Sequence, residues 1–211
     1  MNVHELLTHP EALQAQVRDA LAGLGEPRPL PPGIRRAAVL LLLAHANGEA
    51  ALVLTQRSQT VERHKGQISL PGGVVEPGES PLDAALRETS EEIGVRARDV
   101  TVLGALDEEE TVVSGFRLTP FVGSIPHPYP LQVSAAEVHR VLKVPVRILL
   151  DPRNLRTERW DHDGVHRTVY VFSVDGDIVW GATARVITQF LEAVFHMALP
   201  PDGDRPAGRG Q

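Results

Sequence analysis

The apolar positions of this chain follow two spacings, one typical of strands and one typical of helices. Apolar runs at 35–46 and 51–56 predict two buried strands, and Asn47-Gly48 between them is a favoured hairpin turn. Further strands are predicted at 100–106, 116–125 and 138–144, and a second hairpin joins 167–174 to 177–180 around Asp175-Gly176.

Helical spacing dominates three other segments. Leu13, Val17 and Leu21 share one face of a helix predicted over 10–23. A central helix is predicted between Ser80 and Gly94, a closing helix over 183–199 and a short helical turn over 146–150. Strands on both sides of a central helix, with a closing helix, favour a mixed α/β sandwich.

The 211 residues suggest one main domain with extensions. Residues 1–33 are expected to form a helix and a Pro-rich arm, which contains the sequence EPRPLPPG at 26–33. The main domain is expected to span 34–199. Residues 200–211 are polar and rich in Gly and Pro, so a disordered tail is expected there.

The ends of the central helix are clearly marked. Ser80 suits the N-cap, Pro81 the first helical position and Asp83 a capping box, while Gly94 suits the C-terminal stop. The predicted buried stripe consists of Leu82, Ala85, Leu86, Thr89 and Ile93. The acidic side chains are expected on the opposite, outward face.

Acidic residues are concentrated in and before this helix. Residues 76–92 hold six acidic side chains and one basic one, Arg87, and Glu88, Glu91 and Glu92 share a helical face. Like charges at this spacing destabilise a helix by roughly 0.2–0.5 kcal/mol per pair, and a bound cation would remove the repulsion. Carboxylates suit Mg²⁺, Mn²⁺ or Ca²⁺. A solvated acidic face is the commoner explanation of such spacing alone.

Net charge and cysteine content narrow the function. The net charge of −6 and pI near 5.8 argue against a nucleic-acid partner. The absence of cysteine excludes disulfides and thiolate sites and is compatible with a cytoplasmic protein. The longest apolar run, 37–44, is too short to span a bilayer, and residues 1–14 lack the basic region and apolar core expected of a signal peptide. No membrane association is expected. The sequence leaves the oligomeric state open.

The acidic segment resembles the sequence box of the Nudix hydrolases. Seven positions match, with Thr89 in a slot that is usually aliphatic; they are Gly73, Glu79, Arg87, Glu88, Glu91, Glu92 and Gly94. The resemblance implies a mixed sheet between helices and an enzyme that uses Mg²⁺ or Mn²⁺ to hydrolyse a nucleoside diphosphate linked to another group. The expected chemistry is attack of water on phosphorus.

The resemblance also implies roles for individual residues. Glu88 and Glu92 would be the principal metal ligands, Glu79 a further ligand, and Glu91 a ligand or the base. Arg87 would orient these glutamates. Glu137 lies where such enzymes place a late catalytic carboxylate, although it could be an ordinary surface glutamate.

A Pro-Gly-Gly sequence precedes the box. Gly72 and Gly73 permit close backbone approach and would expose main-chain groups to an ion or a phosphate; a plain turn is the alternative.

Residues 52–73 resemble the coenzyme A diphosphatase branch of the family. The matching positions are Leu54, Thr55, Arg57, Ser58, Gly66, Pro71, Gly72 and Gly73. Leu70 replaces the usual Phe. Glu62 occupies the position of the usual Arg, and the arginine of this chain, Arg63, follows one residue later. The basic cluster Arg57, Arg63, His64 and Lys65 would suit substrate phosphates, or would form a solvated loop.

Two downstream segments also resemble this branch, at 114–116 and 180–184. Phe116 and Trp180 would contact substrate, although large aromatic residues more often belong to the core. The expected substrate is coenzyme A or acyl-coenzyme A. ADP-ribose or a damaged nucleoside triphosphate is the alternative substrate, and a non-catalytic metabolite-binding module is the alternative function.

Overall fold

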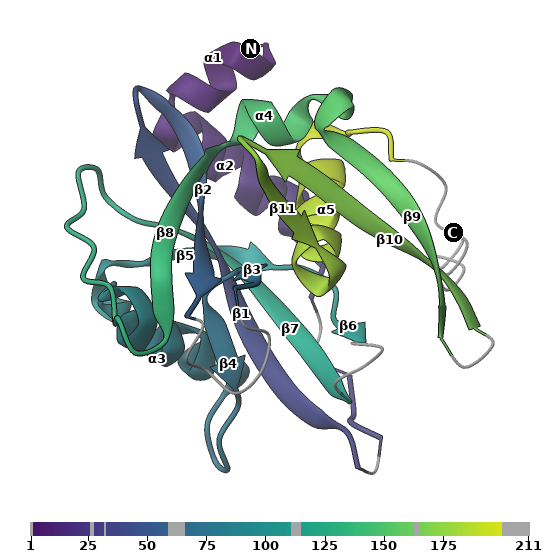
Figure 1. Cartoon of the computed structure of the whole chain (residues 1–211). Coiled ribbons are helices and arrows are strands. Elements are labelled where there is room, and N and C mark those ends of the chain that lie inside the picture. Colours follow the sequence, from purple (N-terminus) through teal and green to yellow (C-terminus); the bar gives the residue numbers. More distant parts are fainter. Residues whose placement is uncertain are drawn as a thin grey trace.

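A large mixed sheet forms the centre of the protein (Figure 1). The computed structural model describes residues 2–25, 28–31, 33–58, 66–110, 115–162 and 165–199. In this sheet β1 (Arg35–Ala46) runs parallel to β7 (Phe116–Ser124), and the other pairings are antiparallel. The remaining strands are β2 (Glu49–Arg57), β3 (Ile68–Ser69), β4 (Gly72–Val74), β5 (Thr101–Ala105), β6 (Glu109–Glu110) and β8 (Val138–Pro145).

Two strands share one edge of β1. Its second half, from Leu42 on, pairs with β2, whereas residues 37–39 pair with β4. Gly72 opens β4 with φ of +145°, and a Cβ there would lie 2.6 Å from the Cα of Val39. Only glycine fits this close approach. The shared edge places the Pro-Gly-Gly segment in the sheet, immediately before the central helix.

The two faces of the sheet bury two separate sets of side chains. Leu40 and Leu42 pack with α3 (Pro81–Ile93) on one face, while Leu41 and Leu43 pack into the larger core on the other. This alternation follows from the period of two in a strand, and it explains why β1 is apolar on both sides. The second face is covered by α1 (Val3–Thr8), α2 (Pro10–Leu21) and α5 (Gly181–Phe195). The predicted α/β/α sandwich is confirmed.

A smaller antiparallel sheet packs against α5. It consists of β9 (Leu155–His162), β10 (Val165–Val174) and β11 (Asp177–Trp180), preceded by α4 (Val146–Leu150). Two short 3₁₀ turns, Ala97–Asp99 and Pro152–Asn154, complete the elements. The rings of Trp160 and Trp180 lie against each other across this sheet, with centroids 5.1 Å apart and planes tilted by 39°.

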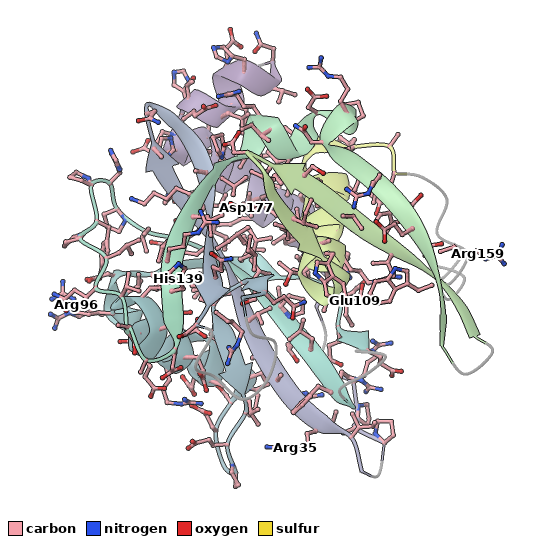
Figure 2. All side chains as sticks on the ribbon, viewed as in Figure 1. Arg35, Arg96, Glu109, His139, Arg159 and Asp177 are labelled. Carbon is pink, nitrogen blue, oxygen red and sulfur yellow. The ribbon has the colours of Figure 1, made fainter. Side chains whose placement is uncertain are left out.

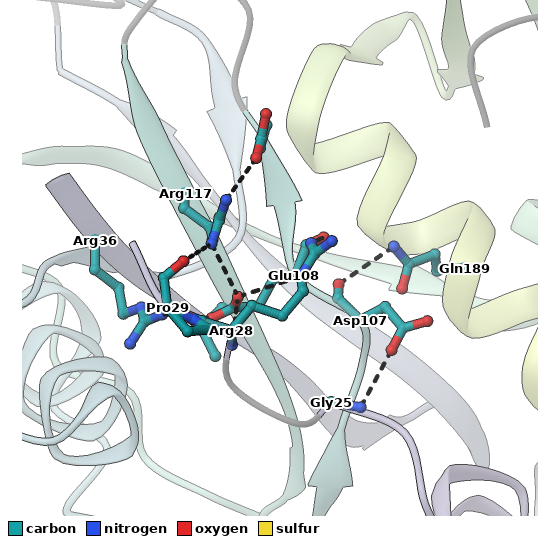
Figure 3. A network of polar contacts seen from close by, with 10 residues as sticks. Gly25, Arg28, Pro29, Arg36, Asp107, Glu108, Arg117 and Gln189 are labelled. Atoms are coloured by element: carbon teal, nitrogen blue, oxygen red, sulfur yellow. Dashed lines mark hydrogen bonds and ion pairs between the residues drawn. The ribbon is translucent and has the colours of Figure 1, made fainter. Parts of the chain in front are cut away.

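A buried carboxylate fastens the Pro-rich arm to the sheet (Figure 3). Glu108 is fully buried and accepts hydrogen bonds from the main-chain N–H of Arg28, at 3.1 Å, and from the hydroxyl of Thr119, at 3.0 Å. Its carboxylate also lies 3.0 Å from Arg36 Nη2 and 4.0 Å from Arg117 Nη1. The described part of the arm is therefore held in place.

Several elements were not predicted, among them α1, β3, β4, β6 and β9. Strands of two or three residues are too short to show a period, and β9 is largely polar, so its pairing with β10 decides its conformation. The closing helix spans 181–195 rather than 183–199, because His196 adopts a left-handed conformation that ends it. The predicted tail at 200–211 lies outside the described residues.

The buried stripe of the central helix differs from the prediction in two ways. Leu82 and Leu86 are only half-buried, whereas Ala84 and Glu92 are buried. The expectation that all the carboxylates lie on the outward face is therefore wrong for Glu92. The predicted capping box is also altered, because the Asp83 carboxylate accepts a hydrogen bond from the Ser80 hydroxyl, at 2.6 Å.

Candidate functional site

The candidate site lies along the side of α3 that is next to β4. Ser80 caps the start of the helix by accepting a hydrogen bond from Asp83 N–H, and Gly94 ends it with φ of +71°. Between these ends, Arg87, Glu88 and Glu91 lie within one helical turn. The site is therefore built mainly on a rigid, capped element.

Arg87 connects three of the four box glutamates to one another. Its Nε donates to Glu79 Oε1 at 2.9 Å, and its Nη1 donates to Glu88 Oε1 at 2.9 Å and to Glu91 Oε2 at 3.2 Å. Its Nη2 also donates to the Val74 carbonyl oxygen of β4, at 3.2 Å. The hydrogen bond from Arg87 holds the pKa of Glu79 below its usual value. These bonds place the guanidinium among the three carboxylates, and the orienting role of Arg87 stays a prediction.

Glu92, the fourth box glutamate, is buried and incompletely paired. Its Oε1 lies 3.8 Å from Arg57 Nη1, and its carboxylate accepts from the main-chain N–H of Gly72. Its Oε2 is buried without a hydrogen-bond partner among the described residues. Burial raises the pKa of Glu92 to about 8, and repulsion from Glu88 and Glu137 adds to the effect of burial.

Glu88 packs directly against the backbone of β4. A Cβ added at Gly73 would lie 2.5 Å and 2.6 Å from the two carboxylate oxygens of Glu88. Any other residue at position 73 would displace this carboxylate. Burial raises the pKa of Glu88, while the hydrogen bond from Arg87 opposes this rise.

The loop that carries Glu137 is tied to the end of α3. Ser134 N–H donates to the Glu92 carbonyl oxygen at 2.9 Å, and Gln132 N–H donates to that of Ile93 at 2.9 Å. On the other side, Ser58 N–H donates to the Glu137 carbonyl oxygen at 2.8 Å. These main-chain bonds hold Glu137 close enough for its charge to raise the pKa values of Glu88 and Glu92.

The donor chemistry of this face fits a divalent cation. Among the described residues, no three acidic, His or Cys side chains are already gathered at metal-binding distance. Glu88 and Glu92 nevertheless offer partly or fully buried carboxylates that repel each other, and one oxygen of Glu92 lacks a partner. A buried, unpaired carboxylate is costly, and hard oxygen ligands suit Mg²⁺ or Mn²⁺.

Of the predicted substrate-binding side chains, Arg57 lies in the site, whereas Phe116 and Trp180 have their contacts elsewhere. Arg57, expected to bind substrate phosphate, lies beside Glu92 at the end of β2, where the pairing of β2 with β8 shifts register. Phe116 lies under the guanidinium of Arg35, 5.2 Å from ring centroid to Cζ, and Trp180 lies against Trp160. Arg63, His64 and Lys65 lie outside the described residues.

The sequence predicted main-chain groups of Gly72 and Gly73 that face a ligand, but not main-chain contacts to the charged side chains of the site. The Gly72 amide and the Val74 carbonyl contact the charged side chains, yet a main-chain group has no sequence signal of its own. Sequence reasoning also missed the approach of Arg57 to Glu92, because the two residues are far apart in sequence. The one sequence signal for this contact was that Arg57 and Glu92 belong to adjoining motifs.

The geometry is accompanied by a match to a known family. The model of the NUDIX domain matches residues 34–160. The chain belongs to the Nudix hydrolase family. It is thus an enzyme of the class that hydrolyses phosphoric anhydrides.

Relatives of similar length support the assignment. The chain is 34% identical over 169 residues to the Nudix hydrolase NudL of Photorhabdus laumondii, a protein described as uncharacterized. The match covers 80% of this chain and 89% of that one. The chain is also 32% identical over 161 residues to the NudL protein of Yersinia pestis, which is likewise described as uncharacterized. This match covers 76% of our chain and 80% of that one.

Solved structures confirm the fold. A MutT/nudix family protein of Enterococcus faecalis superposes with a TM-score of 0.55 at 19% identity, covering 81% of this chain and 66% of that one. DR0079 of Deinococcus radiodurans superposes with a TM-score of 0.50 at 16% identity, covering 77% and 88%. Among the described residues of our chain, no helix has the length and apolarity needed to cross a membrane.

Proposed function

We propose that this Nudix hydrolase cleaves the diphosphate bond of coenzyme A or acyl-coenzyme A in the presence of Mg²⁺ or Mn²⁺. The products would be 3′,5′-ADP and 4′-phosphopantetheine, or its acyl derivative. The main support for this proposal is the state of Glu92. It is a buried carboxylate with an unpaired oxygen and a raised pKa, located beside Glu88 and Arg57. A folded protein retains such a costly group where a ligand compensates for it.

The carboxylates of α3 would hold the cation. Glu88 and Glu92 are the proposed principal ligands, with Glu79 a further ligand and the main chain at Gly73 lying alongside. A bound divalent ion neutralises phosphate charge and makes water more acidic. Arg87 holds Glu79, Glu88 and Glu91 in one arrangement through four hydrogen bonds to their carboxylates, which limits the reorganisation needed when the ion and substrate bind.

Two carboxylates are candidates for the base that takes the proton from water. Glu91 is half exposed and is linked to Glu88 through Arg87. Glu137 is half-buried and lies on the loop tied to the end of α3. A base must lie within hydrogen-bond reach of the attacking water, and both residues lie beside the proposed ligands.

The coenzyme A substrate is supported by the segment that leads into the box. Residues 54–57 form the end of β2, and Ser58 follows it. This segment holds Arg57 beside Glu92. Leu70, which replaces the usual Phe, is 3% exposed and belongs to the core. This departure therefore changes packing rather than a group that faces substrate. The basic residues Arg57, Arg63, His64 and Lys65 are the proposed contacts for substrate phosphates.

A substrate panel with product analysis tests the proposal. Coenzyme A should be cleaved with a higher kcat/KM than its 3′-dephospho form, because a second anionic group helps to position the scissile bond. Arg63→Ala should reduce this preference more than it harms cleavage of the dephospho substrate. Arg98→Ala, a change at an exposed arginine outside the site, is the matched control.

Other outcomes would redirect the assignment. Equal rates on both substrates, or faster cleavage of ADP-ribose, would reject coenzyme A while leaving the hydrolase class in place. No turnover of any nucleoside diphosphate derivative with Mg²⁺ or Mn²⁺ would instead favour a metabolite-binding module.

A further inference from the structure

A cavity lies at the end of β1 opposite its pairing with β4. It has a volume of about 510 Å³ and is lined by residues from α2, β1, β5 and the loop after β7. Three histidines line it, namely His9, His45 and His127, and Glu11 is also among its lining residues. Because β1 and β7 are parallel and end here, the cavity lies outside the carboxyl ends of the parallel pair, where open α/β sheets commonly bind ligands.

The state of His45 favours a cation over an anion. Its Nε2 is buried and has no hydrogen-bond partner among the described residues. Burial lowers the pKa of His45, and repulsion from His127 lowers it further, which favours the neutral ring. A neutral imidazole is the form that binds metal. A neutral ring, in a cavity that Glu11 also lines, gives an anion little attraction.

His9 is oriented by a contact typical of metal-binding histidines. Its Nδ1 lies 2.7 Å from the Glu5 carbonyl oxygen, which only accepts hydrogen bonds, so Nδ1 carries the proton. The other nitrogen, Nε2, is then left unprotonated. Histidine ligands of metals commonly donate their second N–H to a carbonyl in this way. His9 is also the corner between α1 and α2.

The spacing of His45 and His127 is close to that of a two-histidine metal site. Their ring centroids are 6.5 Å apart. Two imidazoles on one Zn²⁺ place their centroids roughly 5–6 Å apart, given Zn–N distances of about 2.0–2.1 Å. His127 is exposed, so a small rotation of its side chain is sterically open. No third ligand is in place among the described residues.

We propose that His45 and His127 form a site for a divalent transition metal such as Zn²⁺, Ni²⁺ or Cu²⁺, separate from the carboxylate site on α3. His9 or Glu11, which line the same cavity, supplies a further ligand. Imidazole selects these metals, whereas the carboxylates of α3 suit Mg²⁺ and Mn²⁺. Bound metal would link the corner of the N-terminal helices to the end of the central sheet.

Metal titration of the full chain, free of any added histidine tag, tests this proposal. Zn²⁺ should bind in calorimetry and raise Tm, because it binds only the folded state. Cu²⁺ should give an electron paramagnetic resonance spectrum with nitrogen coupling, which an all-carboxylate site cannot give. His45→Gln and His127→Gln should each weaken binding by at least about tenfold, since changes to outer-shell partners already cost 10–100-fold.

Three controls make the result decisive. His139→Gln alters an exposed histidine on β8 and should leave the affinity unchanged (Figure 2). Glu92→Gln should also leave the nitrogen-coupled spectrum unchanged, which separates this site from the one on α3. Melting curves without metal show whether each variant folds, and the exposed position of His127 makes its variant the safer one.

Certain results would overturn the proposal. These are a Cu²⁺ spectrum without nitrogen coupling, or Zn²⁺ binding that survives both histidine changes. Inorganic phosphate that shifts the His45 resonances at pH 7 in the absence of metal would identify the cavity as an anion site instead.

Discussion

Glu92 and Glu108 are both buried glutamates, but their surroundings differ. Glu108 receives a main-chain N–H, a hydroxyl and the charges of Arg28, Arg36 and Arg117, and it fastens the arm to the sheet. Glu92 has a more distant arginine and an unpaired oxygen, and its pKa is raised to about 8. The comparison shows that the pairing of a buried charge, rather than its burial, distinguishes a structural carboxylate from a candidate functional one.

The largest expected effect is on turnover. Glu88→Gln and Glu92→Gln should each lower kcat by at least about 10³-fold, because metal stabilisation of the transition state is worth several kcal/mol. Circular dichroism should show an intact fold. Rates measured with Mg²⁺ and Mn²⁺ provide the test, and near wild-type rates in both variants would remove these residues from the site.

Glu108→Gln should lower the stability of the protein and leave its turnover unchanged, the opposite of what is expected for Glu88→Gln and Glu92→Gln. Removing one partner of a buried ionic network costs about 3–5 kcal/mol, so the free energy of unfolding in urea should fall by that amount. The rate per folded molecule should stay near that of the wild type. Arg28→Ala removes a half-exposed partner and should cost less. If Glu108→Gln were neutral in stability and inactive, the assignment of the two glutamates would be reversed.

The metal-free protein should lose stability as the pH rises. The carboxyl of residue 92 titrates near 4.5 in the unfolded chain and near 8 in the fold, so the folded state holds an extra proton between these values. The free energy of unfolding should therefore fall between pH 4.5 and 8, by up to about 1.4 kcal/mol per pH unit, and then level off.

Unfolding curves in EDTA across this range provide the measurement. Glu92→Gln should flatten the slope, and Glu76→Gln, a change at an exposed glutamate near the site, should leave it in place. A wild-type slope in Glu92→Gln would mean that another group is responsible.

The smallest expected effect separates the two candidate bases. The Gln variant of the true base, Glu91 or Glu137, should retain metal affinity and lose kcat by at least about 100-fold. The acidic limb of its pH–rate profile should also disappear. Unchanged profiles in both variants would exclude both residues as the base.

Much of the fold was predictable because local signals agreed with tertiary packing. The two hairpin turns were correctly predicted, and Asn47, Gly48, Asp175 and Gly176 all have positive φ. The capped helix from Ser80 to Gly94 was predicted for the same reason. The inward position of Glu92 was not, because an amphipathic pattern assigns every charge to solvent. A site that buries a charge contradicts that pattern.

The candidate site was predicted mainly through its side chains. The box placed Glu79, Arg87, Glu88 and Glu91 together, and the structure joins them by hydrogen bonds. The contributions of the Gly72 amide and of the 132–134 loop depend on strand pairing and loop closure, which no local pattern encodes.

The paired tryptophans make the small sheet an optical reporter. The chain contains two tryptophans, and both are in this pair. Indole fluorescence and near-ultraviolet dichroism therefore report on β9 to β11, whereas far-ultraviolet dichroism follows the helices. A fluorescence change that precedes the loss of helical signal on heating would show that this sheet opens before the rest of the molecule.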